Sequence, residues 1–94
     1  MNFDNIQFTV HAIQRVFERG ISTDDVIEVL KNWNVISLYP DDKPYPSYLL
    51  FGLIKKKPIH VVVSIDSENK ICYVITVYHP DPKFWQDDFR QRRE

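Results

Sequence analysis

The sequence predicts an α+β domain in which two N-terminal helices pack on a four-stranded antiparallel sheet, followed by a short C-terminal helix or tail. Apolar residues recur at helical spacing near the start of the chain, and four short runs rich in β-branched and aromatic residues follow. The loops between these runs are too short for the crossovers that parallel strands need, so an antiparallel meander is expected. A chain of 94 residues holds one hydrophobic core, which makes residues 1–94 a single domain.

The first helix is predicted over residues 10–19, with Thr9 as its N-cap and Gly20 in the left-handed position that ends many helices. A second helix begins at Ser22 and carries an apolar stripe that ends at Trp33. The tight turn at Gly20 joins the two into a hairpin. At about 100° per residue, the apolar residues of the first helix share one face that we expect to be buried: Val10, Ile13, Val16 and Phe17.

The predicted strands are residues 34–39, 48–54, 59–66 and 71–78, separated by turn residues. Alternation along the third strand turns its isoleucines and valines to one face and His60 to the other. Strict alternation along the fourth strand groups Thr76 and Tyr78 with Cys72 and Val74. If the polar faces match, His60, Thr76 and Tyr78 come together on one side of the sheet.

Composition excludes several classes of protein. The net charge of −1 argues against a basic surface over the whole molecule, so any nucleic-acid site is a local patch. The chain shows no membrane-spanning run and no signal peptide, which predicts a cytoplasmic protein. Cys72, the single cysteine, is expected to be an inert sheet residue. The histidines lack ligand spacing and two glycines cannot form a phosphate-binding loop, so no metal and no cofactor are expected.

The first helix carries His11, Arg15 and Arg19 at positions i, i+4 and i+8, which places them in one line along its surface. A solvated helix face would account for such a line. However, Arg, His, Tyr and Thr side chains without a metal also suit RNA cleavage. In that reaction the ribose 2′-hydroxyl is the nucleophile, so the protein supplies only a base, an acid and cations.

The candidate catalytic residues for this chemistry are His11, Arg15, Arg19, His60, Thr76 and Tyr78. Either histidine could serve as the general base or acid, with Tyr78 as the alternate proton carrier. Flanking phosphates could be held by cations of the C-terminal tail and of the loop between the predicted strands 48–54 and 59–66: Lys55, Lys56, Lys57, Arg90, Arg92 and Arg93.

Several motifs together resemble the domain of unknown function family 4258. They are T-x-H-A-x-x-R-x-x-x-R-G-I-S at 9–22, Tyr-Pro-Asp at 39–41, P-x-H-V-V at 58–62, I-T-V-Y-x-P-D at 75–81, then Trp85 and Arg92-Arg93. The resemblance implies the fold shared by barnase, RelE and related ribonucleases. It also implies the toxin of a bacterial type II toxin-antitoxin system, an endoribonuclease acting on mRNA, paired with a small antitoxin that is often of a zinc-finger type. The six candidate catalytic residues all lie within these motifs.

Two other functions remain open. A non-catalytic module could bind RNA or an acidic protein through the same His and Arg surface, in which case His60→Ala would leave binding unchanged. An adaptor could instead bind a partner through an exposed tail containing Trp85 and Phe89.

Overall fold

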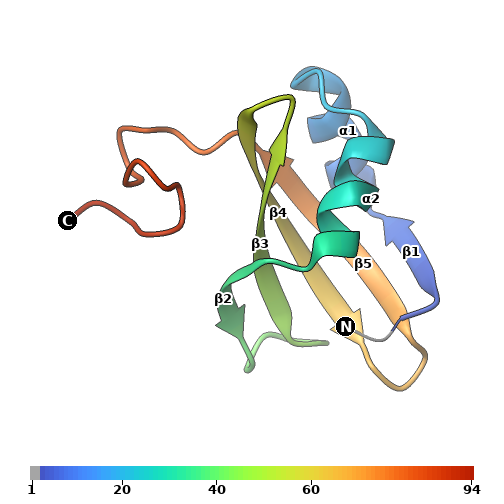
Figure 1. Ribbon diagram of the computed structural model, residues 1–94. Helices are drawn as coiled ribbons and strands as arrows, with labels where there is room; N and C mark the ends of the chain where they lie inside the picture. The colour runs from blue at the N-terminus through green and yellow to red at the C-terminus, as the bar shows by residue number, and fades with distance from the viewer. Residues whose placement is uncertain (1–2) are drawn as a thin grey trace.

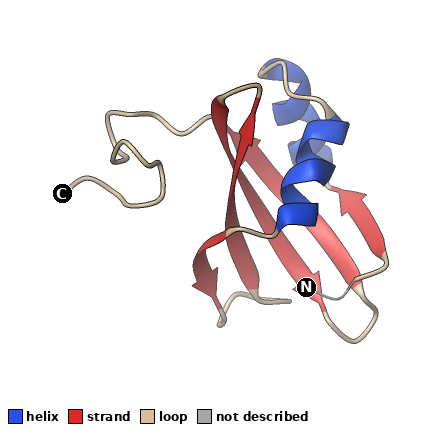
Figure 2. Ribbon diagram, viewed as in Figure 1, coloured by secondary structure: helices blue, strands red, loops and turns tan. Residues whose placement is uncertain are grey.

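The computed structural model describes residues 3–94 as two helices on one face of a five-stranded mixed sheet (Figures 1 and 2). In chain order the elements are β1 (Asn5–Phe8), α1 (Val10–Glu18), α2 (Thr23–Asn32), β2 (Val35–Tyr39), β3 (Ser47–Ile54), β4 (Lys57–Asp66) and β5 (Ile71–Tyr78). The strand order across the sheet is β1-β5-β4-β3-β2. The α+β class with two early helices is therefore confirmed.

The predicted sheet of four antiparallel strands was wrong in one respect. Strands β2 to β5 form the expected antiparallel meander, but β1 adds a fifth strand that pairs parallel to β5 at the sheet edge. Ile6 and Phe8 of β1 pack against the core, whereas Asn5 and Gln7 are exposed. A strand of four residues that is half polar gives only a weak alternation signal.

Both helices begin, and α1 also ends, where their capping residues predict. The Thr9 hydroxyl accepts a hydrogen bond from the Ala12 N–H at 3.0 Å, and Ser22 forms a reciprocal capping box with Asp25. Gly20 adopts a positive φ of 65°, which lets the chain reverse after α1.

The predicted buried face of α1 was wrong. Ala12 and Val16 are buried under the helix, whereas Val10 and Phe17 are 76% and 88% exposed and Ile13 is also exposed. The helix is thus turned by about one residue step, roughly 100°, from the expected orientation. The cause is the one-residue connection from β1, because Thr9 is fixed to β5 by hydrogen bonds to the carbonyls of Val74 and Ile75.

Helix α2 lies against β3 through a close contact at Gly52. A Cβ atom at Gly52 would lie 2.4 Å from a methyl carbon of Val29, so only glycine allows this approach. Val26, Val29 and Leu30 are the α2 residues that are fully part of the buried core. The helices therefore cover one face of the sheet and leave the other to the rest of the chain.

A β-bulge corrects the predicted faces of β5. The register shifts between Val62 and Val63 of β4, so that Val62 pairs with Thr76 and Val63 pairs with Val74. Cys72, Val74 and Val77 therefore all face the core, although the last two are three residues apart. Thr76 and Tyr78 lie on the opposite face, away from Cys72 and Val74.

The C-terminal segment, residues 79–94, is an irregular tail without the short helix that was one of the two expectations. Its one sheet-like contact is an isolated bridge between Trp85 and Arg92. The tail lies on the side of the sheet opposite the helices (Figure 1). It thereby covers part of the face that carries His60.

The orientation of α1 can be tested by truncating neighbouring side chains. We expect Val16→Ala to lower the free energy of unfolding by about 2 kcal/mol, because it deletes buried carbons. We expect Phe17→Ala to change it by less than about 0.5 kcal/mol, because that ring is exposed. Urea denaturation measures both values, and a loss of several kcal/mol in Phe17→Ala would contradict this orientation.

Candidate functional site

The candidate site is the sheet face opposite the helices, called here the open face and defined by Phe51, His60, Val62, Thr76 and Tyr78. Antiparallel pairing places Phe51 and Tyr78 on either side of His60, and Val62 beside Thr76. Residues two apart in a strand share a face, so alternation brings these side chains together. The sequence predicted this grouping of His60, Thr76 and Tyr78.

His60 is 0% exposed, and both of its ring nitrogens have partners. Its Nε2 lies 2.7 Å from the carbonyl oxygen of Phe89, and its Nδ1 lies 3.1 Å from the hydroxyl of Tyr78. A carbonyl only accepts, so Nε2 carries the proton and donates it. In the neutral ring Nδ1 is then an acceptor, and the Tyr78 hydroxyl donates to it. Phe89, His60 and Tyr78 thus form a chain of hydrogen bonds with a defined direction.

Aromatic side chains enclose the His60 ring. Trp85 from the tail meets it edge to face at a centroid distance of 4.5 Å, and Phe51 lies at 6.3 Å on the neighbouring strand. Trp85 is itself buried. The guanidinium of Arg90 sits 5.2 Å above the Phe51 ring and also donates to the Asn34 side-chain oxygen. These contacts hold the tail on the open face.

Burial controls the acid-base properties of both groups. Burial lowers the pKa of His60, an effect partly offset by its hydrogen bond to Phe89. Burial also raises the pKa of Tyr78, Tyr39 raises it further, and Arg92 lowers it. His60 is therefore held neutral and Tyr78 keeps its proton near neutral pH. Tyr78 is only partly buried, so it is the member of the pair that a ligand can reach.

The line of cations on α1 lies on the helix side of the sheet and is separated from the His60–Tyr78 pair. His11 is exposed, and Arg15 forms an ion pair of 2.9 Å with Glu18. Arg19 lies at the end of α1 and lines a pocket with Lys55 and Lys57. The structure thus separates His11, Arg15 and Arg19 from the other three candidate catalytic residues.

The arginines of the tail occupy different environments. Arg92 lies 5.4 Å above the Trp85 ring, close enough to Tyr78 to affect its pKa. Arg93 forms an ion pair with Asp87 at 3.2 Å and donates to the Pro82 carbonyl. Arg92 is therefore the tail cation best placed to meet a ligand at Tyr78. Lys56 is exposed at the tip of the β3–β4 hairpin.

Sequence reasoning missed one feature of the site and left a second open. Phe89 acts through its backbone carbonyl, which no residue type predicts. Trp85 was a candidate either for anchoring the tail or for binding a partner, and it packs on His60. The unusual density of aromatic residues in a charged tail was the one available signal that this segment returns to the domain.

Two further features bear on the chemistry. Cys72 is fully buried, and burial raises the pKa of its thiol to about 12, which suits the predicted structural role. Among residues 3–94, no group of three or more His, Cys, Asp or Glu side chains is arranged to hold a metal ion. In the same residues, no helix is long and apolar enough to cross a membrane.

Fold and site together define a small α+β protein with an enclosed His–Tyr pair under its C-terminal tail. The chain belongs to the family described as Domain of unknown function (DUF4258), whose family model matches residues 8–79. The resemblance of the sequence to this family is thereby confirmed. The matched region includes His60 and Tyr78 and ends before the tail. Comparisons with curated proteins and with solved structures gave no match.

The protonation state of His60 predicts a specific pH dependence of stability. Below about pH 6.5 the unfolded chain binds a proton at His60 that the folded protein, with its lowered pKa, does not. Stability is therefore lost as the pH falls from 6.5 to 5.5. Urea denaturation at both values measures this loss in the wild type and in His60→Gln, where we expect it to be absent. His11→Gln, at an exposed position, is the control, and an equal loss in His60→Gln would contradict the assignment.

Proposed function

We propose that this protein is a metal-independent endoribonuclease, the toxin of a bacterial type II toxin-antitoxin system. The observation that carries the proposal is the directed chain from the Phe89 carbonyl through His60 to the Tyr78 hydroxyl. A proton carrier, a base behind it and a third group that orients the base are the parts that general acid-base catalysis requires. The helices packed on one face of an antiparallel meander support a fold of the barnase and RelE type.

The chain acts as a proton relay. As the ribose 2′-oxygen attacks phosphorus, its proton passes to the Tyr78 oxygen while the Tyr78 proton passes to Nδ1 of His60. The bond from phosphorus to the 5′-oxygen breaks, and that oxygen takes a proton from water. The products are a 2′,3′-cyclic phosphate and a 5′-hydroxyl. His60 then returns its extra proton through Tyr78 to the hydroxide that this water leaves, which the lowered pKa of its buried ring favours.

Charge on the reacting phosphate is met by Arg92, which lies on the same side of the sheet as Tyr78. Guanidinium groups bind phosphate oxygens through two parallel hydrogen bonds, so one arginine can both orient and neutralise the group. Thr76 lies two residues before Tyr78 on the open face, where it pairs with Val62, and supplies a further hydroxyl. In this proposal His11 and Arg15 take no part in the chemical step, because they lie on the helix side of the sheet.

The cognate antitoxin, of a zinc-finger or other small type, belongs to the same proposal.

One observation favours the alternative function of a non-catalytic binding module. Val10, Ile13 and Phe17 form an exposed apolar stripe on α1, beside the polar line that begins at His11. Such a surface is more typical of protein binding than of catalysis.

Cleavage of RNA in EDTA tests the proposed reaction. We expect the purified wild-type protein to cut free or ribosome-associated RNA and to leave 2′,3′-cyclic phosphate ends. We expect Tyr78→Phe to reduce the cleavage rate by about 10²–10⁴, the usual contribution of a general acid or base. Gel analysis of the fragments and of their end groups gives both results.

The matched control is Tyr73→Phe, which removes a hydroxyl from the same strand at the stacked Tyr45–Tyr73 pair. It should cut RNA at the wild-type rate. Cleavage that stops in EDTA, or equal rates for the two tyrosine variants, would refute the relay. RNA that is bound through Arg92 but never cut would support the binding module instead.

A further inference from the structure

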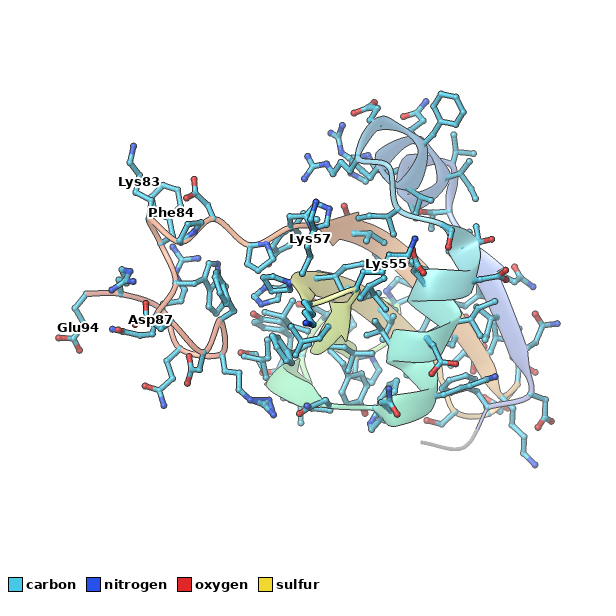
Figure 3. The ribbon with its side chains drawn as sticks, turned by 45° about the horizontal axis from the view of Figure 1, so that its top comes forward. Lys55, Lys57, Lys83, Phe84, Asp87 and Glu94 are labelled. Carbon is cyan, nitrogen blue, oxygen red and sulfur yellow. The ribbon has the colours of Figure 1, made fainter. Side chains whose placement is uncertain are left out.

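A second cavity lies away from the open face, where the turn after α1 meets the β3–β4 hairpin and the start of the tail. Its volume is about 180 Å³, and its polar lining is dominated by basic side chains: Arg19, Lys55, Lys57, His79 and the single acid Asp25. Figure 3 shows Lys55 and Lys57 at the hairpin, between the tail and the helices. This cavity is called the basic pocket below.

The charges of the basic pocket are unbalanced. Within residues 3–94, none of Arg19, Lys55 and Lys57 forms an ion pair. Asp25 is already used by α2, because its carboxylate accepts the Ser22 N–H at 3.1 Å. Three cations and one carboxylate leave two positive charges, which matches a phosphate monoester better than the single charge of a phosphodiester.

Lys55 occupies a backbone position that does not favour lysine. The two-residue turn of the hairpin places Lys55 at φ 52° and Lys56 at φ 68°, the left-handed pair in which Asn-Gly is preferred. A non-glycine residue in this region is strained. Lys56 is strained in the same way but does not line the pocket, so this turn allows the strain and the charge of Lys55 to be tested separately.

The hydrogen-bond partner of His79 shows which of its ring nitrogens carries the proton. Its Nδ1 lies 3.0 Å from the Pro58 carbonyl, which only accepts, so Nδ1 carries the proton. In the neutral ring Nε2 is then left as an acceptor for a ligand proton, and in the charged ring it is a donor. The backbone of β4 thus orients this histidine, which also lines the basic pocket.

A larger cavity of about 320 Å³ adjoins the basic pocket and shares Lys57 and His79 with it. The rest of its lining is apolar: Pro58, Pro80, Pro82 and Phe89. The basic pocket is smaller than the roughly 300 Å³ at which small-molecule sites begin, whereas the adjoining cavity reaches that size. A charged group fits the first, and a flat apolar ring fits the second. Phe89 also connects this cavity to His60 through its carbonyl.

We propose that the basic pocket binds the terminal phosphate monoester of an RNA strand, with the end nucleoside resting in the adjoining cavity. This inference rests on the proposed function. It adds a direction to the bound RNA, because one end of the RNA strand is fixed in the pocket while the rest of the strand runs toward Tyr78. Lys57 and His79 line both cavities, which places them beside the junction of phosphate and nucleoside in this proposal.

The test compares short RNAs of one sequence that carry a 5′-phosphate, a 3′-phosphate or only hydroxyl ends, at a fixed salt concentration. Fluorescence anisotropy with the full chain gives the affinities, and inorganic phosphate is the competitor. We expect one phosphorylated end to bind at least tenfold more tightly than the hydroxyl-ended RNA, and inorganic phosphate to abolish the difference.

Two hairpin variants separate binding from folding. Lys55→Asn removes a pocket cation but suits the turn, so we expect a higher Tm and loss of the tenfold preference. Lys56→Gly also suits the turn but leaves the pocket intact, so we expect a higher Tm and an unchanged preference. Equal affinity for phosphorylated and hydroxyl ends, or a preference that survives Lys55→Asn, would overturn the inference. Binding of inorganic phosphate without any RNA-end preference would overturn it as well.

The outcome is separable from that of the proposed function. An RNA-end preference without cleavage would refute the ribonuclease and keep the pocket. Cleavage in EDTA without any end preference would do the reverse.

Discussion

The buried ring of His60 is the constraint on which the rest of the site depends. A histidine that is 0% exposed must have both ring nitrogens satisfied, and the two partners come from two different segments that follow it in the chain. Tyr78 comes from the neighbouring strand and Phe89 from the tail. The tail therefore completes the domain, because without Phe89 and Trp85 the imidazole would lie open on the sheet. The same two bonds fix the tautomer and so give the pair a direction in which protons can move.

The one-residue connection at Thr9 has an equally large effect on the other side of the sheet. By tying the start of α1 to β5, it turns Ala12 inward and leaves Phe17 exposed. It also points Arg19 toward the β3–β4 hairpin, where it joins Lys55 at the basic pocket. The polar line that the sequence shows on α1 is thus divided: one end faces solvent and the other a cavity.

The sequence was sufficient to predict most of the fold and, within the site, the grouping of His60, Thr76 and Tyr78. Alternation, caps and turn residues located both helices and the four antiparallel strands, and alternation on β4 correctly separated His60 from the core. Strand β1 was too short and too polar to detect, and the orientation of α1 was wrong as a result. The bulge in β5 could not be read from the sequence either, since one extra residue changes the face of all that follow. Contacts made by a backbone carbonyl, such as that of Phe89, leave no mark in side-chain identity.

The most direct measurement of the central claim is the state of the His60 ring by ¹⁵N NMR at neutral pH. We expect a neutral ring that carries its proton on Nε2, with Nδ1 accepting from Tyr78. Replacing Tyr78 by Phe should move the Nδ1 resonance while the proton stays on Nε2. A ring protonated on Nδ1, or a charged imidazolium, would contradict the hydrogen-bond chain and the relay built on it.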